Sequence, residues 1–166
     1  GVDYFSMLPV EGWVASNMEE DGRACGVFAV GSNSFLGGKG YCPPTEMSDG
    51  SKEGNLLGFV GCWSAHSQYT QDVTIPAGKY TLEISYYNTG GTNEINKNLM
   101  GFIDADGNEY LGVMKTFETG KWLKEKIKFE LTEETSGKFT IGYIAANTGS
   151  GNMPHFFIDG ISLYYV

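Results

Sequence analysis

Residues 79–87 read Lys-Tyr-Thr-Leu-Glu-Ile-Ser-Tyr-Tyr, and this stretch decides the fold class. Apolar residues occupy alternate positions from Tyr80 to Tyr86, and polar residues occupy the positions between them. Alternation with a period of two predicts a β-strand that has one face in a core and the other toward solvent. Residues 75–79, Ile-Pro-Ala-Gly-Lys, come just before and predict a turn, because proline presets φ and glycine accepts positive φ.

The same alternation recurs on both sides of this strand. We expect further strands over residues 12–15, 24–30, 99–104, 109–114, 125–131, 138–146 and 155–166. Residues 105–108, Ala-Asp-Gly-Asn, are typical of a hairpin turn, and residues 31–55 predict a long loop outside the sheets. In the last strand the apolar phase slips at Asp159-Gly160, which predicts a β-bulge. No helical period persists, so the pattern indicates an all-β sandwich of two antiparallel sheets, in one domain over residues 1–166.

The composition limits the class of partner. The chain carries 20 acidic and 11 basic side chains, a net charge of −9, which disfavours nucleic acid and anionic membrane surfaces. No apolar run approaches the ~20 residues of a membrane-spanning helix, so we expect no membrane insertion. The two histidines come with no Gly-x-Ser-x-Gly elbow, and the paired glutamates lie in turn-like stretches. We therefore expect no catalytic machinery.

Three cysteines, Cys25, Cys42 and Cys62, cannot all pair within one chain. Their spacing matches no zinc motif. Two alternatives remain, which are one disulfide with one further thiol, or three buried thiols that act as small hydrophobes. A Cys42–Cys62 disulfide would tie the long loop to the strand that follows it and leave Cys25 as a buried thiol.

Several of these segments together resemble the galactose-binding-like superfamily of carbohydrate-binding modules. The resemblance is carried by Gln68-Tyr69-Thr70-Gln71, by residues 73–80 (Val-Thr-Ile-Pro-Ala-Gly-Lys-Tyr), by Trp122 ahead of residues 125–131, by residues 157–163 (Phe-Ile-Asp-Gly-Ile-Ser-Leu) and by Gly12-Trp13. It implies a jelly-roll β-sandwich from a secreted or cell-surface, extracytoplasmic protein of a bacterium. In such a protein this chain would be one monomeric module among others.

The resemblance also implies a structural Ca²⁺ ion, for which Asp159 matches the acidic ligand on the closing strand. No Asn-x-x-Phe-Glu sequence precedes Trp13, so Asp3 or Glu11 would have to supply the N-terminal ligand. Oxygen ligands of this kind suit calcium. The alternative is that Asp159 is a carboxylate hydrogen-bonded inside the bulge, because an unpaired buried carboxylate is costly.

Aromatic side chains beside amide-rich loops are the best candidates for a ligand site. A sugar ring has an apolar C–H face that can cover an aromatic ring, while amides and acids hydrogen-bond to its hydroxyl groups. Trp13 and Trp122 precede apolar strand patterns and are predicted to lie in the core. We expect Trp63 or Tyr87 to be the stacking platform. The predicted ligand-binding residues are Trp63, His66, Tyr87, Asn88 and Asn147.

These expectations give one leading hypothesis and one rival. The chain is predicted to be a non-catalytic carbohydrate-binding module that recognises a neutral glycan with weak affinity. The rival is a structural spacer or protein-interaction sandwich of a bacterial surface protein, without a glycan site. An exposed aromatic ring with amides and acids around it would favour the glycan module, whereas an exposed apolar patch without polar groups would favour the rival.

Overall fold

The computed structural model describes residues 10–16, 23–32, 42–61, 63–89, 93–147 and 153–166, and it confirms the all-β prediction. Within these ranges the chain forms eleven strands and no α-helix. The strands are β1 (Val14–Ser16), β2 (Arg23–Ala29), β3 (Asn55–Gly61), β4 (His66–Ile75), β5 (Gly78–Asn88), β6 (Ile95–Asn98), β7 (Gly101–Asp104), β8 (Glu109–Leu111), β9 (Trp122–Leu131), β10 (Thr135–Ala145) and β11 (His155–Tyr165). The described residues contain no helix of the length and hydropathy that crossing a membrane requires.

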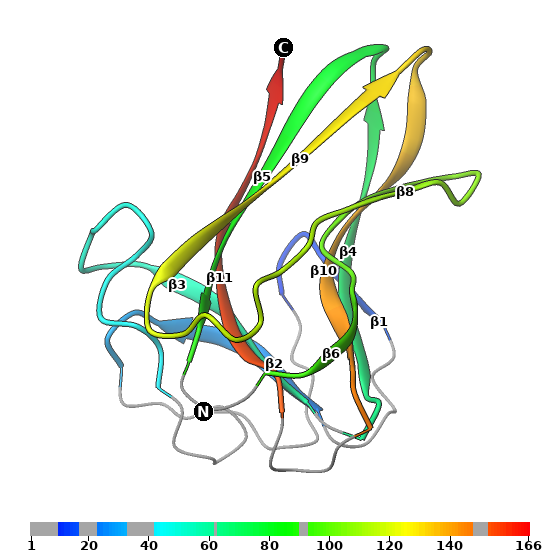
Figure 1. Cartoon of the computed structure of the whole chain (residues 1–166). Helices are drawn as coiled ribbons and strands as arrows, with labels where there is room; N and C mark the ends of the chain where they lie inside the picture. Colours follow the sequence, from blue (N-terminus) through cyan, green and yellow to red (C-terminus); the bar gives the residue numbers. More distant parts are fainter. Residues whose placement is uncertain (1–9, 17–22, 33–41, 62, 90–92, 148–152) are drawn as a thin grey trace.

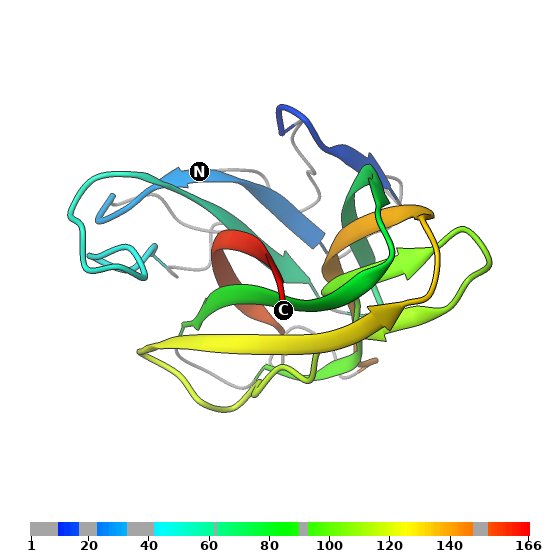
Figure 2. The same cartoon turned by 90° about the horizontal axis from the view of Figure 1, so that it is seen from above.

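The strands form two antiparallel sheets, as predicted. The five-stranded sheet has the order β2-β3-β11-β5-β9, and the six-stranded sheet has the order β1-β4-β10-β7-β8, with β6 paired to β10 (Figure 1). Seen from above, β5, β9 and β11 form one layer, and β4, β10 and β8 belong to the other (Figure 2). The core lies between these layers.

The stretch at residues 79–87 shows how alternation builds that core. It lies in β5, whose inward side chains are buried between the sheets and are Tyr80, Leu82, Ile84 and Tyr86. Leu82 pairs with Ile127 of β9 on one side and with Leu163 of β11 on the other. Three neighbouring strands therefore place apolar side chains at the same level. Full burial of each large apolar side chain stabilises the fold by roughly 1.5–3 kcal/mol.

The predicted β-bulge is present on β11. The register of the pairing with β5 shifts between Asp159 and Ile161. Gly160 between them has a φ of 75°, a left-handed conformation that suits glycine. Because of this extra residue, Ile158 and Ile161 both pair with core-facing residues of β5 although they are three positions apart.

The second half of the predicted long loop, residues 42–54, lies outside the sandwich. It covers a satellite cluster on the outer face of the five-stranded sheet, formed by Phe28, Leu56, Val60, Met153 and Phe157, with Met47, Tyr87 and Trp122 partly buried against it. Trp122 Nε1 donates a hydrogen bond to the carbonyl oxygen of Glu46 at 2.9 Å. Trp122 therefore packs outside the sandwich, whereas Trp13 packs partly buried against the main core. Residues 33–41 of the predicted loop lie outside the described residues.

Several strands differ from the sequence-based expectation, and β4 and β6 lie outside the ranges in which strands were expected. β3 was not expected, because most of its residues are buried on both faces and it lacks alternation. β8 ends at Leu111 and not at residue 114, because the chain leaves the sheet there and Met114 turns into the core.

Cys42 is a free thiol among the described residues, and the Cys42–Cys62 disulfide considered above stays a prediction. Cys62 lies outside the described residues. Cys25 is buried in the main core beside Tyr69.

Candidate functional site

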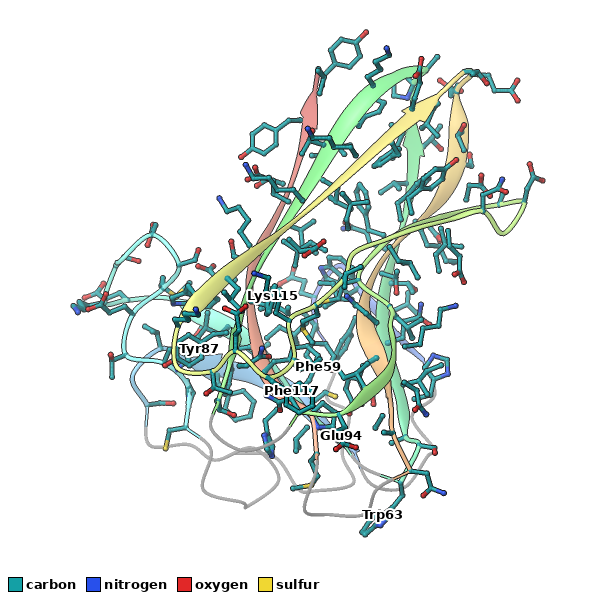
Figure 3. All side chains as sticks on the ribbon, viewed as in Figure 1. Phe59, Trp63, Tyr87, Glu94, Lys115 and Phe117 are labelled. Atoms are coloured by element: carbon teal, nitrogen blue, oxygen red, sulfur yellow. The ribbon has the colours of Figure 1, made fainter. Side chains whose placement is uncertain are left out.

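Trp63 occupies the turn between β3 and β4 at one end of the sandwich and is 48% exposed (Figure 3). Trp63 and Ser64 both have a left-handed backbone, with φ of 53° and 60°. Tight turns of this kind strongly favour asparagine and glycine, and a bulky residue there is an outlier. A tryptophan therefore does not stabilise the backbone conformation of this turn, which points to a role for the ring itself.

Backbone hydrogen bonds bring two other segments to this turn. Ser64 N donates to Ala146 O at 3.5 Å, and Ala145 N donates to Ala65 O at 2.9 Å, so the end of β10 lies beside the turn. Ala146 N in turn donates to Glu94 O at 3.3 Å. Three segments that are far apart in the sequence therefore meet at the end of the sandwich.

Polar side chains are carried on these segments near Trp63. Asn147 is exposed and directly follows Ala146. Asn96 is exposed, and its Nδ2 donates to Ala145 O at 3.0 Å. Glu94 is half-buried, and His66 is half-buried at the start of β4. We call this group the Trp63 surface, and its members are Trp63, His66, Glu94, Asn96 and Asn147.

The Trp63 surface contains three of the predicted ligand residues and two that were not singled out. Trp63, His66 and Asn147 were predicted from their residue types and from the loops beside them. Glu94 and Asn96 lie in the amide-rich stretch 88–98, so a signal existed, but nothing in the sequence shows that this stretch meets the end of β10.

Tyr87 lies apart from the Trp63 surface (Figure 3). It is half-buried on the outer face of the five-stranded sheet, in the satellite cluster. Its ring packs edge-on against Trp122, with centroids 5.5 Å apart and planes at 64°. The alternation predicts this face correctly, but the structure does not bring Tyr87 and Trp63 to one site.

Asn88 is fully buried and serves as an anchor for the loop between β8 and β9. Its Nδ2 donates to Lys115 O at 2.7 Å and to Glu118 O at 3.0 Å. Its backbone carbonyl accepts a hydrogen bond from Gly120 N at 2.9 Å. The structure thus places this predicted ligand residue inside the protein, away from the Trp63 surface.

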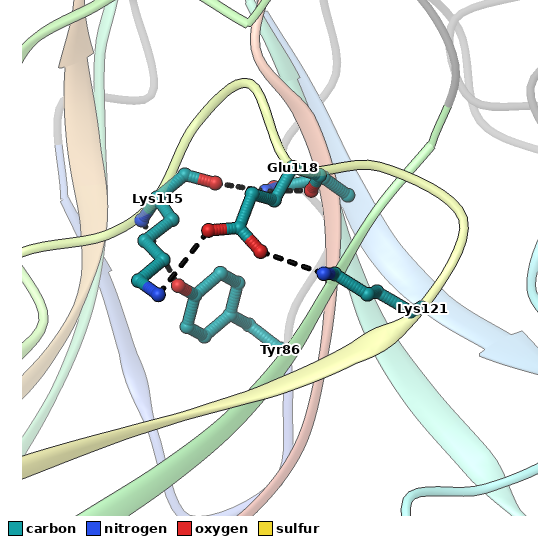
Figure 4. Close-up of polar contacts among 5 residues, drawn as sticks. Tyr86, Lys115, Glu118 and Lys121 are labelled. Atoms are coloured by element: carbon teal, nitrogen blue, oxygen red, sulfur yellow. Dashed lines mark hydrogen bonds and ion pairs between the residues drawn. The ribbon is translucent and has the colours of Figure 1, made fainter.

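An ion-pair network fixes the same loop on its outer side (Figure 4). Glu118 accepts from Lys121 at 2.7 Å and from Lys115 at 3.2 Å, and these two lysines hold the pKa of the Glu118 carboxyl below its usual range. Lys115 N donates to the hydroxyl of Tyr86 at 2.9 Å. The loop is therefore tied down at both ends while Phe117 at its tip is 64% exposed.

Asp159 accepts two hydrogen bonds at the bulge. Both come from Ser48 in the loop at residues 42–54, which we call the covering loop. Asp159 Oδ2 lies 2.7 Å from Ser48 N and 2.5 Å from Ser48 Oγ. Among the described residues no group of three or more His, Cys, Asp or Glu side chains converges, and Asp3 lies outside them. The donors of Ser48 fit the hydrogen-bonded alternative, and the role of Asp159 as a calcium ligand stays a prediction.

Comparison with protein-family models and with curated proteins gives no match. Among solved structures, a family 4 carbohydrate-binding module (CBM4) is similar with a TM-score of 0.51 and 15% identity, over 94% of this chain and 96% of that chain. The enzymatically active domain of tailspike protein 4 of bacteriophage CBA120 has a TM-score of 0.49 and 10% identity, over 94% and 20% of the two chains. A structure of carbohydrate-binding modules from the β-sandwich superfamily has a TM-score of 0.45 and 10% identity, over 94% and 58%. The chain therefore has the β-sandwich fold of a carbohydrate-binding module, which confirms the predicted fold.

Proposed function

We propose that this chain is a non-catalytic carbohydrate-binding module that binds a neutral glycan weakly through the Trp63 surface. The observation that carries the proposal is the exposed Trp63 ring, held in left-handed backbone at a turn whose neighbouring segments carry Asn147, Asn96 and Glu94. The fold shared with a family 4 carbohydrate-binding module supports it. We infer an extracytoplasmic, bacterial setting and a monomeric module for the same reason.

The chemistry of recognition follows from these side chains. The C–H face of a sugar ring covers the indole of Trp63 and removes apolar surface from water. The amides of Asn96 and Asn147 each offer a donor and an acceptor, and the Glu94 carboxylate accepts from hydroxyl groups. An anionic sugar would be repelled by Glu94, so a neutral glycan suits this surface best.

Weak affinity follows from the shallow position of the site. One stacked face and hydrogen bonds that compete with water give a dissociation constant roughly between micromolar and millimolar, about −8 to −4 kcal/mol. Loss of the stacking ring should cost about 2 kcal/mol, as for a central aromatic side chain of an interface.

The test separates binding from folding by using the unusual backbone at Trp63. Asparagine suits left-handed backbone better than tryptophan. The free energy of unfolding of Trp63→Asn should therefore equal that of the parent chain or exceed it by up to about 1 kcal/mol. This variant should nevertheless lose retardation in affinity electrophoresis through a panel of neutral polysaccharides. Phe117→Ala removes a comparably exposed ring from another loop and should bind like the parent chain. If no polysaccharide retards the parent chain, or if Trp63→Asn is retarded equally, the spacer without a glycan site takes the place of this proposal.

A further inference from the structure

Basic side chains gather on the outer face of the five-stranded sheet. Residues 115–128 carry five of the 11 basic residues and two acidic ones, in a chain whose net charge is −9. Lys115 and Lys121 of this stretch lie before β9 and pair with Glu118, which leaves the three lysines of β9. Lys124, Lys126 and Lys128 stand at alternate positions of β9, and they point away from the core because Ile127 is buried in it. A locally positive face on an acidic protein favours an anionic ligand at that place.

Ion pairing neutralises only part of this charge. Glu83 of β5 lies between Lys124 and Lys126, at 3.2 Å from each ammonium group. Among the residues that the structure describes, Lys128 has no carboxylate within ion-pair distance. The excess of positive charge is therefore centred on β9, with Lys128 as its unpaired member.

A hollow of 410 Å³ opens beside Lys128, a size in the range of small-molecule sites. Its polar lining consists of Lys79, Thr81, Lys128 and Glu130. Lys79 and Glu130 form a long ion pair of 3.8 Å, and both side chains are mostly exposed, so their attraction is weak and both can rearrange. The charged side chains that line the hollow are two lysines and one glutamate, so their net charge is positive.

An aromatic ring stands at the other side of Thr81. Thr81 pairs with Lys128 of β9 on one side and with Tyr164 of β11 on the other. Neighbouring strands lie about 4.8 Å apart, so roughly 10 Å separates the backbones of Lys128 and Tyr164. Tyr165 packs edge-on against core residue Tyr80 at 5.5 Å, so alternation turns Tyr164 outward, where it is 51% exposed.

We propose that this row of Tyr164, Thr81 and Lys128 is a second glycan site, which takes a sugar that bears a carboxylate. The sugar's C–H face covers the Tyr164 ring, a ring hydroxyl bonds to Thr81, and the carboxylate pairs with Lys128 and Lys79. A neutral sugar would leave the lysines unused, and a simple polyanion would leave the ring unused. The site lies near the C-terminal end of β11, far from the Trp63 surface at the opposite end of the sandwich, and does not depend on the function proposed for that surface (Figures 1 and 3).

Affinity electrophoresis with polygalacturonate, a carboxylated polysaccharide, tests this proposal at about 20 mM salt, where screening is weak. The parent chain should be retarded, and both Lys128→Glu and Tyr164→Ala should weaken binding by about tenfold or more. Lys138→Glu is the matched control, because it changes the net charge equally but lies on the other sheet, paired with Asp72 at 2.6 Å. It should bind within about twofold of the parent chain, and so should Trp63→Asn.

Four outcomes would overturn the proposal, provided that thermal melts show every variant folded. The first is that polygalacturonate does not retard the parent chain. The second is that Lys138→Glu weakens binding as much as Lys128→Glu, which would mean a diffuse charge effect. The third is that polyglutamate, which has no sugar ring, binds as tightly as polygalacturonate. The fourth is loss of polygalacturonate binding in Trp63→Asn, which would place the acidic glycan on the Trp63 surface.

Discussion

The contact between Ser48 and Asp159 allows a quantitative test of how the covering loop is held. Asp159 Oδ2 accepts from Ser48 N at 2.7 Å and from Ser48 Oγ at 2.5 Å. Hydrogen bonds to a charged group contribute about 1.5–3 kcal/mol each, and water competes here because Ser48 is exposed. Asp159→Ala removes both bonds and should therefore cost about 2 kcal/mol in the free energy of unfolding. Ser48→Ala removes only the hydroxyl bond and should cost about 1 kcal/mol.

Thermal and urea melts of the two variants and of the double variant measure these values. For a chain of this length, 1 kcal/mol shifts Tm by about 2–4 °C, so Asp159→Ala should lower Tm by about 4–8 °C. The double variant should be no less stable than Asp159→Ala alone, since the Ser48 hydroxyl then has no carboxylate to lose.

Melts in the presence of added Ca²⁺ and of a chelator distinguish the hydrogen-bonded carboxylate from a calcium ligand. The hydrogen-bonded arrangement predicts identical curves in both solutions. A bound ion would stabilise only the native state, so the chelator would lower Tm by several degrees and Asp159→Ala would abolish the difference. A Ca²⁺-dependent Tm together with an unchanged stability of Ser48→Ala would refute the hydrogen-bond reasoning.

Two further predictions concern buried polar groups. Burial lowers the pKa of His155 from 6.5 to about 4, so between these values the unfolded chain binds more protons than the folded chain. The contribution of His155 to stability is full above pH 6.5 and is lost as pH falls toward 4, by about 2 kcal/mol between pH 7 and pH 5. Urea unfolding at the two pH values measures this loss, and a His155→Gln variant with an undiminished pH dependence would contradict it. Asn88→Ala leaves two loop carbonyls without their donors and should cost about 2–3 kcal/mol. Amide hydrogen exchange should accelerate in residues 115–120, and unchanged protection there would mean that Asn88 does not anchor the loop.

The local alternation of side chains by itself determined most of the long strands and their inward faces. In β5 the period of two separates buried from exposed positions, because successive side chains of a strand point to opposite faces. The phase slip at Asp159-Gly160 predicted the bulge, since only an extra residue lets both halves of β11 face one core. The strand β3 escaped prediction because it is buried on both faces and carries no alternation.

Only the tertiary structure decided which polar and aromatic side chains share a site. Ser64, which follows Trp63, and Glu94 both form backbone hydrogen bonds with Ala146 at the end of β10. Tyr164 and Lys128 lie on either side of Thr81 because β5 runs between β11 and β9. In the sequence Tyr87 and Trp63 were equal candidates. In the structure Tyr87 is half-buried against the satellite cluster, on which Met47 of the loop at residues 42–54 also packs. The exposure of a side chain depends on which residues from elsewhere in the chain pack over it. The alternation within a single strand does not predict these contacts.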